Sequence, residues 1–381
     1  MLPPMDFALD DEQALIVQTV RRFVDKDVRA WAADADRAGA APDRLFTLGP
    51  DLGFFIDALT EADGGLLSGP YSHVTRALRG LELGRGCAGM AALLETNVEP
   101  ALAITRWGSP AAKAALLPAL AGGGLATTGR DARGRLTVSA DGDGVRISGR
   151  IGPLPALGRA GHVLLIATSG DEPVLLLIAT ASPGAEREAL TPSGWRTAGW
   201  GALTCRDVTI PADHVIARGP SAAAAVTRVL SWYRASLAAR AAGVATAAME
   251  HARAYAADRV QFGQPIGTFE ALIRLQDDAD TGASAARLMA LHAAWLLDGA
   301  DDDDDHRLAR AADAASRARV LAGDVVSRAT IDAVQILGGY GFVNDYPVEK
   351  LMRDARAFEQ LLGDERHDRI LAAKGAHPSR A

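Results

Sequence analysis

The spacing of apolar residues changes twice along the chain, and this change constrains the fold more strongly than any other feature of the sequence. Through Ala121 the apolar residues recur at the three- and four-residue intervals of amphipathic helices. After Gly122-Gly123-Gly124 they form short β-branched runs separated by Gly, Pro and Asp, and the helical spacing returns at Ala222. The sequence therefore predicts a helical domain, a small β-domain and a second helical domain, in this order.

The periodicity also predicts individual elements. Helices are expected over residues 10–33, 45–55, 71–83, 89–107 and 110–121, and again over 222–255, 269–297 and 308–337. Strands are expected over 136–139, 145–148, 163–167, 174–178 and 206–210, with a hairpin turn at Asp141–Gly144. These elements predict three domains that cover residues 1–123, 124–217 and 218–381.

Composition and charge exclude several classes of protein. The 381-residue chain has a formal net charge of -7, which argues against nucleic acid as the main partner because a phosphate-binding surface needs clustered excess cations. Cys87 and Cys205 are too few for a disulfide framework. Neither a signal peptide nor a membrane-spanning apolar run is evident, so a cytoplasmic protein is expected. The acidic run Asp301–Asp305 is interpreted as a solvated loop rather than a metal site.

A glycine-rich break near the C-terminus interrupts the helical pattern. The apolar helix end Ala333–Leu337 is followed by Gly338-Gly339-Tyr340-Gly341, and three glycines in four residues allow a sharp turn or the close approach of another group. A helix C-cap accounts for the glycines alone. It does not account for Gln335 just upstream, or for Arg353-Asp354-Ala355-Arg356 and Gly363 downstream. This combination therefore indicates a functional element.

Several motifs together resemble the acyl-CoA dehydrogenase family of flavoproteins. The most specific are Arg259-Val260-Gln261-Phe262-Gly263-Gln264-Pro265-Ile266 and the stretch from Gln335 to Gly341. Weaker matches extend along the chain and are found at Met5-Asp6-Phe7, Leu52-Gly53, Gly64-Gly65, Trp107-Gly108, Leu117–Leu120, Asp207-Val208 and Ile210-Pro211. The resemblance implies an α+β, mostly α fold with an N-terminal helical domain, a small β-barrel-like middle domain and a C-terminal four-helix bundle.

The resemblance also implies a reaction and the residues that it requires. In this family a carboxylate base removes the α-proton of an acyl-CoA thioester while the flavin of FAD accepts the β-hydride. At the two positions where relatives carry the basic Glu, this sequence has Leu362 and Tyr233. Leucine cannot accept a proton, and tyrosine is a poor base because its ordinary pKa is about 10. The next residue, Arg234, is expected to contact the substrate.

The two groups of residues that bind FAD in this family are retained to different degrees. The Thr-Glu-Pro and Gly-Ser-Asp loop expected after Leu125 is replaced by Ala126–Asp131, and the Trp-Ile-Thr element is replaced by Gly152–Ala156. The residues that in relatives reach the neighbouring subunit's FAD are retained, namely Arg259, Gln261, Phe262, Gln335, Gly338 and Gly339. The arginine would pair with the pyrophosphate, a contact that suits a guanidinium group.

This difference leads to one hypothesis and two alternatives. The chain is expected to be the non-catalytic subunit of a dimeric or tetrameric acyl-CoA dehydrogenase, in which a paralogous subunit supplies the base and FAD is shared across the interface. Its substrate would be a fatty-acid- or steroid-derived acyl-CoA thioester, and its electron acceptor an electron-transferring flavoprotein. One alternative is an atypical homo-oligomeric flavoenzyme with a relocated base, acting on acyl-CoA or acyl-carrier-protein thioesters. The other is a structural or regulatory homologue without a cofactor.

Overall fold

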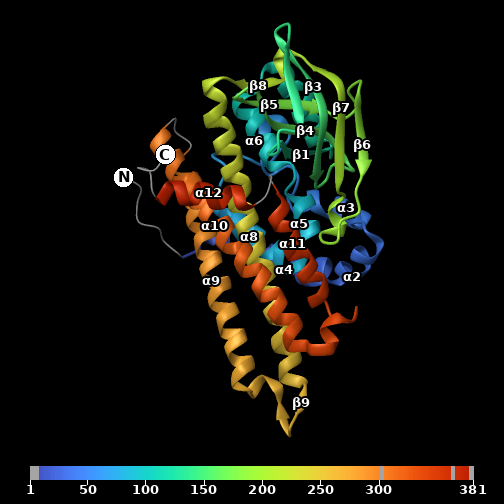
Figure 1. Ribbon diagram of the computed structural model, residues 1–381, viewed down its shortest axis with the longest axis vertical. Coiled ribbons are helices and arrows are strands. Elements are labelled where there is room, and N and C mark those ends of the chain that lie inside the picture. Colours follow the sequence, from blue (N-terminus) through green and yellow to red (C-terminus); the bar gives the residue numbers. More distant parts are fainter. Residues whose placement is uncertain (1–7, 301–303, 362–364, 377–381) are drawn as a thin grey trace.

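The computed structural model describes residues 8–300, 304–361 and 365–376. In these ranges the chain forms helices up to Ala121, two β-sheets between Leu125 and Arg218, and helices again from Pro220 (Figure 1). This order confirms the fold class predicted from the sequence. None of the helices in these ranges combines the length and the apolar character that crossing a membrane requires.

The N-terminal domain consists of helices, and side-chain caps fix the first residues of several of them. The carboxylate of Asp10 accepts a hydrogen bond from the Gln13 N–H at 2.7 Å, and the Gln13 side chain accepts one from the Asp10 N–H at 3.3 Å. The Ser109 side chain caps the helix that starts at Pro110. In chain order the elements are α1 (Asp11–Phe23), the π-helical turn η1 (Val24–Val28), α2 (Arg29–Ala38), α3 (Asp43–Asp51), η2 (Glu61–Asp63), α4 (His73–Gly86), α5 (Ala88–Leu94), α6 (Val98–Trp107) and α7 (Pro110–Ala121).

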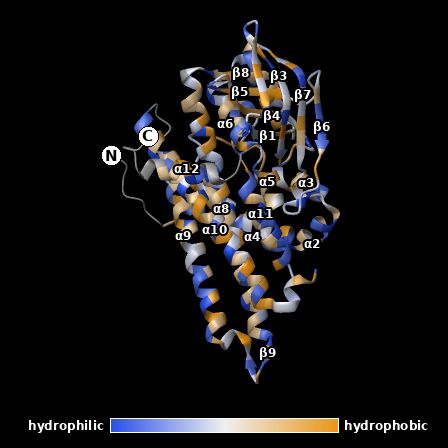
Figure 2. Ribbon diagram, in the orientation of Figure 1, coloured by the Kyte–Doolittle hydropathy of each residue, from blue (hydrophilic) through white to orange (hydrophobic). Residues whose placement is uncertain are grey.

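The middle domain consists of two four-stranded sheets around one apolar core. Figure 2 shows many apolar residues in the strands of these sheets. The strand orders are β1-β4-β5-β8 and β2-β3-β7-β6. The strands are β1 (Leu125–Arg130), β2 (Leu136–Asp141), β3 (Gly144–Leu154), β4 (Ala160–Ser169), β5 (Glu172–Ala179), β6 (Ala185–Ala189), β7 (Gly201–Ile210) and β8 (Val215–Arg218). Asp141 pairs with Gly144, which confirms the predicted hairpin turn.

Three long helices form the axis of the C-terminal domain. In chain order the elements are α8 (Pro220–Asp258), β9 (Val260–Gln261), β10 (Gln264–Pro265), η5 (Ile266–Thr268), α9 (Glu270–Asp298), α10 (Asp305–Leu337), η6 (Gly338–Phe342), α11 (Val348–Gln360) and α12 (Glu365–Ala376). The long helices extend away from the β-domain, and the β9–β10 hairpin lies at their far end (Figure 1). This arrangement separates the hairpin from the sheets by the full length of the helical domain.

Two glycines allow α4 and α8 to lie in direct contact. A Cβ atom on Gly84 would lie 2.2 Å from the carbonyl oxygen of Arg240, and one on Gly243 would lie 2.1 Å from the carbonyl oxygen of Leu81. Side chains cannot be accommodated at these distances, so both helices present bare backbone to each other. The close packing makes α8 the centre of the helical core and fixes the residues halfway along it.

One predicted helix is wrong, and the reason lies in the β-domain. The helix expected over 89–107 is divided into α5 and α6 by a break at Asn97. The Asn97 side chain donates hydrogen bonds to the carbonyl oxygens of Phe55 and Gly124 and accepts one from the Ala126 N–H at 2.9 Å. The break therefore satisfies backbone groups at the start of β1, a tertiary requirement that helical periodicity does not report.

His73 is a buried imidazole at the start of α4 whose protonation state makes stability depend on pH. Its ring stacks on Trp232 with a centroid separation of 5.7 Å. Burial, together with the guanidinium groups of Arg76 and Arg228, lowers the pKa of His73 from 6.5 to about 3. The unfolded chain binds a proton near pH 6.5 and the folded protein does not. The stabilisation is therefore complete above that pH and is lost as the pH falls toward 3.

We expect the free energy of unfolding to fall by about 2 kcal/mol more between pH 7 and pH 5 in the unaltered protein than in a His73→Phe variant. Phenylalanine keeps the aromatic contact with Trp232 but has no proton to bind. Urea unfolding at the two pH values measures both falls. Equal falls in the two proteins would show that His73 does not carry this pH dependence.

Candidate active site and interface elements

A cleft of about 270 Å³ lies where the β-domain meets the helical core. Its walls are the end of β1, the turn at 131–135, residues 150–155 at the end of β3, Tyr233 from α8, and Leu361 after α11. The cleft thus brings Tyr233 next to both segments at which the in-chain flavin elements are expected.

The β3 part of the cleft offers few hydrogen-bond donors. Pro153 and Pro155 have no N–H group. The carbonyl oxygen of Pro155 already accepts a hydrogen bond from Thr127 Oγ1 at 2.8 Å. The carbonyl oxygens and ring nitrogens of a flavin need donors along the edge of the ring. This segment therefore does not fit a flavin ring.

The turn after β1 is closed by the side chain of Asp131. Its two carboxylate oxygens accept hydrogen bonds from the backbone N–H groups of Arg135 at 2.9 Å and Leu136 at 2.8 Å, so these donors are not free for a phosphate. Thr128 also lines the cleft, and its hydroxyl has no hydrogen-bond partner among the described residues. One unpartnered hydroxyl does not replace the missing donors, so the in-chain segments do not fit the cofactor.

Tyr233 is buried between the cleft and a group of charged side chains. The guanidinium carbon of Arg240 lies 5.8 Å from the centroid of its ring. Burial raises the pKa of Tyr233, and Arg240 opposes the rise only in part. The phenol is therefore protonated at neutral pH, which disfavours Tyr233 as a relocated base.

Charged residues fill the space beside this tyrosine. Glu95 and Glu99 are fully buried at the junction of α5 and α6. Arg76 pairs with Glu99 at 2.6 Å, and Arg240 lies 3.8 Å from Glu95. Buried charges of this kind persist because they are paired with one another. An apolar acyl chain would therefore meet charged groups, not an apolar channel, on this side of the cleft.

Arg234 is buried and is held by an acidic residue of α12. Its Nε donates to Asp368 at 2.7 Å, and the second oxygen of that carboxylate accepts from Arg319 at 2.5 Å. Arg319 also donates to the carbonyl oxygens of Phe358 at 3.1 Å and Leu361 at 2.7 Å. The cluster holds α12 and the end of α11 against α8 and α10. The expected contact of Arg234 with a substrate stays a prediction.

The described part of the cleft contains no carboxylate that is placed to act as a base. Asp131, the acidic residue that lines it, is engaged by backbone N–H groups. Asp368 is shared by two guanidinium groups. Leu362, which occupies the expected base position, lies outside the described residues, directly after Leu361 of the cleft wall. The described site therefore lacks the proton acceptor that dehydrogenation needs.

A second group of predicted residues gathers at the far end of the long helices. The hairpin turns at Phe262, whose side chain is 95% exposed and whose φ of 52° is left-handed. Gln261 is exposed beside it. The guanidinium carbon of Arg259 lies 5.8 Å from the ring centroid of Tyr340 in the glycine-rich segment. The structure thus brings the hairpin motif and the C-terminal glycine segment together.

The glycine segment after α10 is open to its surroundings. A Cβ atom on Gly338 or Gly339 would meet no atom of the chain within 4 Å, and Gln335 is exposed in the preceding helical turn. Gly341 is different, because a Cβ there would lie 2.6 Å from the carbonyl oxygen of Val334. Gly338 has a left-handed φ of 57°, whereas Gly339 has neither a positive φ nor a close neighbour. The chain's own packing therefore does not require a glycine at 339, and its absent side chain leaves room for an external group.

The cleft and the hairpin cannot hold one small ligand within a single chain. Tyr233 lies in the middle of α8, and Arg259 directly follows the last residue of that helix. At the rise of an α-helix, the intervening residues span roughly 37 Å. A small ligand that contacts both kinds of residue therefore requires two chains.

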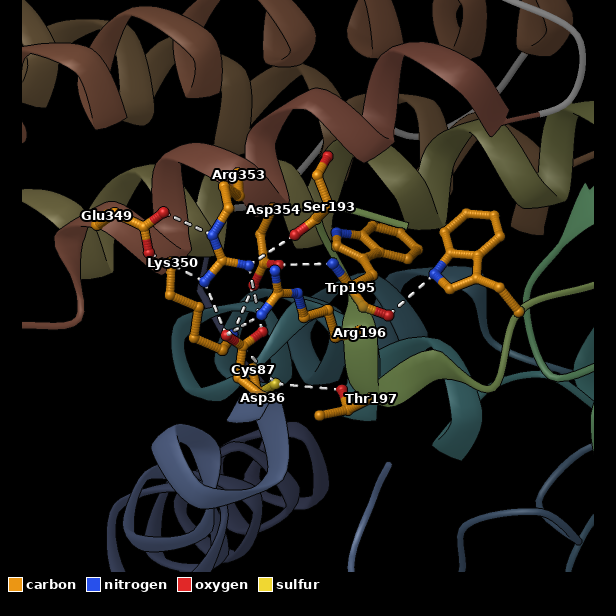
Figure 3. A network of polar contacts seen from close by, with 11 residues as sticks. Asp36, Cys87, Ser193, Trp195, Arg196, Thr197, Glu349, Lys350, Arg353 and Asp354 are labelled. Atoms are coloured by element: carbon orange, nitrogen blue, oxygen red, sulfur yellow. Dashed lines mark hydrogen bonds and ion pairs between the residues drawn. The ribbon is translucent and has the colours of Figure 1, made fainter. Parts of the chain in front are cut away.

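The Arg353-Asp354 element joins three parts of the chain through a polar network (Figure 3). Asp354 accepts a hydrogen bond from the Trp195 N–H and pairs with Lys350 Nζ, both at 2.6 Å. Arg353 pairs with Asp36 of α2 at 2.7 Å. The element therefore fastens α11 to the N-terminal helices and to the loop before β7.

The whole chain is similar to dehydrogenases of acyl-CoA thioesters. It is 29% identical over 390 residues to the probable acyl-CoA dehydrogenase YngJ of Bacillus subtilis, covering 97% of this chain and 99% of the relative. It is 29% identical over 382 residues to the cyclohex-1-ene-1-carbonyl-CoA dehydrogenase of Geobacter metallireducens, covering 96% and 98%. The solved structure of butyryl-CoA dehydrogenase from Megasphaera elsdenii matches with a TM-score of 0.86 at 24% identity, covering 98% of this chain and 100% of that chain.

Two family models match the two helical parts of the chain. The model for the N-terminal domain of acyl-CoA dehydrogenases matches residues 10–124, and the model for the C-terminal domain matches residues 223–377. The two matched ranges lie before and after the residues of the two β-sheets, in the order that the structure shows. The chain belongs to the acyl-CoA dehydrogenase family.

Proposed function

We propose that this chain is a non-catalytic subunit of an FAD-dependent acyl-CoA dehydrogenase and that it completes the FAD site of a paralogous subunit. One contrast carries the proposal. The described part of the chain's own cleft lacks a placed base, and its in-chain segments do not fit a flavin, whereas the exposed hairpin and the open glycine segment lie together far from that cleft. The exposed hairpin and the glycine segment are therefore expected to contact a second chain and the cofactor that it holds.

The residues at the far end of the long helices suit a cofactor held by a partner. Arg259 would pair with the pyrophosphate, since a guanidinium group binds phosphoryl oxygens bidentately. Gln335 and Gly338-Gly339 would lie against the adenosine part, where the missing side chains permit close approach. FAD, when bound, supplies the hydride acceptor for α,β-dehydrogenation of an acyl-CoA thioester.

Phe262 supports an interface at the hairpin. An aromatic ring that is 95% exposed gains free energy when a second surface removes it from water. Gln261 lies beside it and would provide a polar contact at the rim of that interface. The proposed assembly is a dimer or tetramer in the cytoplasm, and two buried free cysteines, Cys87 and Cys205, agree with a reducing compartment.

The proposal extends to the electron acceptor and to the acyl group. A chain of the structure titled electron transferring flavoprotein of Acidaminococcus fermentans matches with a TM-score of 0.86 at 25% identity, which supports an electron-transferring flavoprotein as acceptor. The substrate class is a fatty-acid- or steroid-derived acyl-CoA thioester. The charged residues beside Tyr233 support binding of the acyl group by the partner and not by this chain.

Replacing Arg259 with alanine is expected to reduce the FAD retained by the heteromeric complex at least tenfold. The pyrophosphate loses a charge-assisted hydrogen bond worth roughly 1.5–3 kcal/mol. The measurement is the flavin absorbance per complex after gel filtration. Arg253→Ala is the matched control, because Arg253 lies in the last turns of α8, shortly before Arg259, and pairs with Asp280 of α9. That variant should retain FAD.

Three results would contradict the proposal. Full FAD retention in the Arg259→Ala complex would remove the role of the hairpin. An isolated chain that carries stoichiometric FAD and oxidises an acyl-CoA would identify a homo-oligomeric flavoenzyme, and a Tyr233→Phe variant would then test the relocated base. A chain that binds neither flavin nor a paralogue on co-expression would be a homologue without a cofactor.

A further inference from the structure

The cleft that does not fit a flavin has a strongly cationic lining. Four arginines contribute to its walls, namely Arg130, Arg133, Arg135 and Arg150. Among the described lining residues, Asp131 is the single carboxylate, and it accepts backbone hydrogen bonds within the turn. The lining therefore favours an anionic ligand.

Two of these guanidinium groups, those of Arg133 and Arg135, are free to contact a ligand. Arg150 is not one of them, because it pairs with Glu188 at 2.8 Å, and both side chains of that pair are exposed. The side chains of Arg133 and Arg135 are exposed on the turn after β1 and form no hydrogen bond or ion pair within residues 8–300, 304–361 and 365–376. Arg133 and Arg135 therefore offer their full donor sets at the mouth of the cleft.

Buried cations behind the cleft add to the positive potential. Arg234 and Arg319 share the carboxylate of Asp368. Burial and the nearby guanidinium of Arg234 lower the pKa of Arg130 to about 10, so Arg130 remains protonated at neutral pH. An anion in the cleft would stabilise this group of positive charges.

The size of the cleft limits the anion. Its volume of about 270 Å³ lies just below the range of roughly 300–1,000 Å³ that is usual for sites holding drug-sized ligands. A diphosphate group fits such a space, and its oxygens match the fork of donors on a guanidinium group. The nucleoside of a nucleotide would extend from the open side.

We propose that this cleft binds a diphosphate group, either free pyrophosphate or the diphosphate of a nucleotide, with Arg133 and Arg135 as its principal contacts. The site takes the place of the flavin ring that the β3 segment cannot accommodate. The inference does not depend on the proposed role of the hairpin, because it concerns a ligand of the isolated chain.

The test is isothermal titration of the isolated chain with sodium pyrophosphate, with ADP and with FAD. We expect pyrophosphate and ADP to bind and the Arg133→Ala/Arg135→Ala variant to lose at least tenfold in affinity for both. Both side chains are exposed, so the thermal unfolding temperature of the variant should be unchanged. Arg146→Ala is the matched control, because Arg146 lies on β3 outside the cleft, pairs with Asp141 at 2.8 Å and should leave the affinity unaltered.

The affinities of pyrophosphate and ADP show whether the ligand is the free anion or a nucleotide. Tighter binding of ADP than of pyrophosphate would identify a nucleotide ligand, and equal binding would identify the free anion. Two results would overturn the proposal: no heat of binding with either anion, or equal affinity in the double variant and the unaltered chain. Flavin-coloured protein after incubation with FAD alone would also overturn it, because the cleft would then accept the ring.

Discussion

Replacing Asp354 with alanine is expected to lower the free energy of unfolding by about 3–5 kcal/mol, because the change leaves a buried cation without its partner. Asp354 is 0% exposed and contacts Lys350 Nζ and the Trp195 N–H. Burial alone would lower the pKa of Lys350, but the adjacent Asp354 raises it above its usual value. The lysine therefore stays charged, and the loss of Asp354 removes the group that stabilises this charge. Urea unfolding measures the change.

A control and a second variant separate this effect from a general disturbance of α11. Glu359→Ala removes a more exposed ion pair with Arg356 on the same helix and should change stability by less than about 1 kcal/mol. Adding Lys350→Met to Asp354→Ala removes the unpaired charge and should recover part of the loss. The explanation fails if Asp354→Ala and Glu359→Ala destabilise equally, or if the double variant is no more stable than Asp354→Ala.

Replacing Asp368 with alanine is the second change with a large expected effect, again a loss of about 3–5 kcal/mol in the free energy of unfolding. Asp368 is 2% exposed and binds Arg234 at 2.7 Å and Arg319 at 2.5 Å, so its removal leaves two buried guanidinium groups without this carboxylate. The change should also loosen α12 from the helical core. Hydrogen exchange of residues 365–376, together with urea unfolding, measures both consequences.

The adjacent residue of α12 provides the comparison. Arg369 pairs with Asp324 at the surface, where both side chains are about half exposed. Asp324→Ala should therefore change stability by less than about 1 kcal/mol and leave the exchange of α12 unaltered. Similar exchange rates in Asp368→Ala and in the unaltered protein would show that Asp368 does not hold α12 in place.

The two ion clusters explain how the chain keeps the architecture of its family although the described part of its cleft contains no placed base. Asp354 joins α11 to the loop before β7, and Asp368 joins α12 to α8 and α10. In both clusters the carboxylate is engaged by groups of the chain itself. The hairpin and the glycine segment are therefore presented on a rigid helical frame whatever the state of the chain's own cleft.

The order of domains and most long elements followed from the sequence, because these elements bury long apolar stretches. The helices α7, α8, α9 and α10 match their predicted ranges closely, and the buried strands β4 and β5 carry long apolar runs. The strands β1, β6 and β8 were missed. β6 is largely exposed and carries the charged run Glu186-Arg187-Glu188, so its pattern does not resemble a strand with one buried face.

The sequence by itself determined the family and the two groups of candidate residues, since short motifs such as Arg259–Ile266 and Gln335–Gly341 are contiguous in the chain. Only the tertiary structure decided what surrounds them. It paired Arg234 with Asp368 across 134 residues and left Phe262 exposed at the end of α8. The physical reason is that periodicity reports which face of an element is buried, whereas ion pairing, exposure and the distance between sites depend on which elements meet in space.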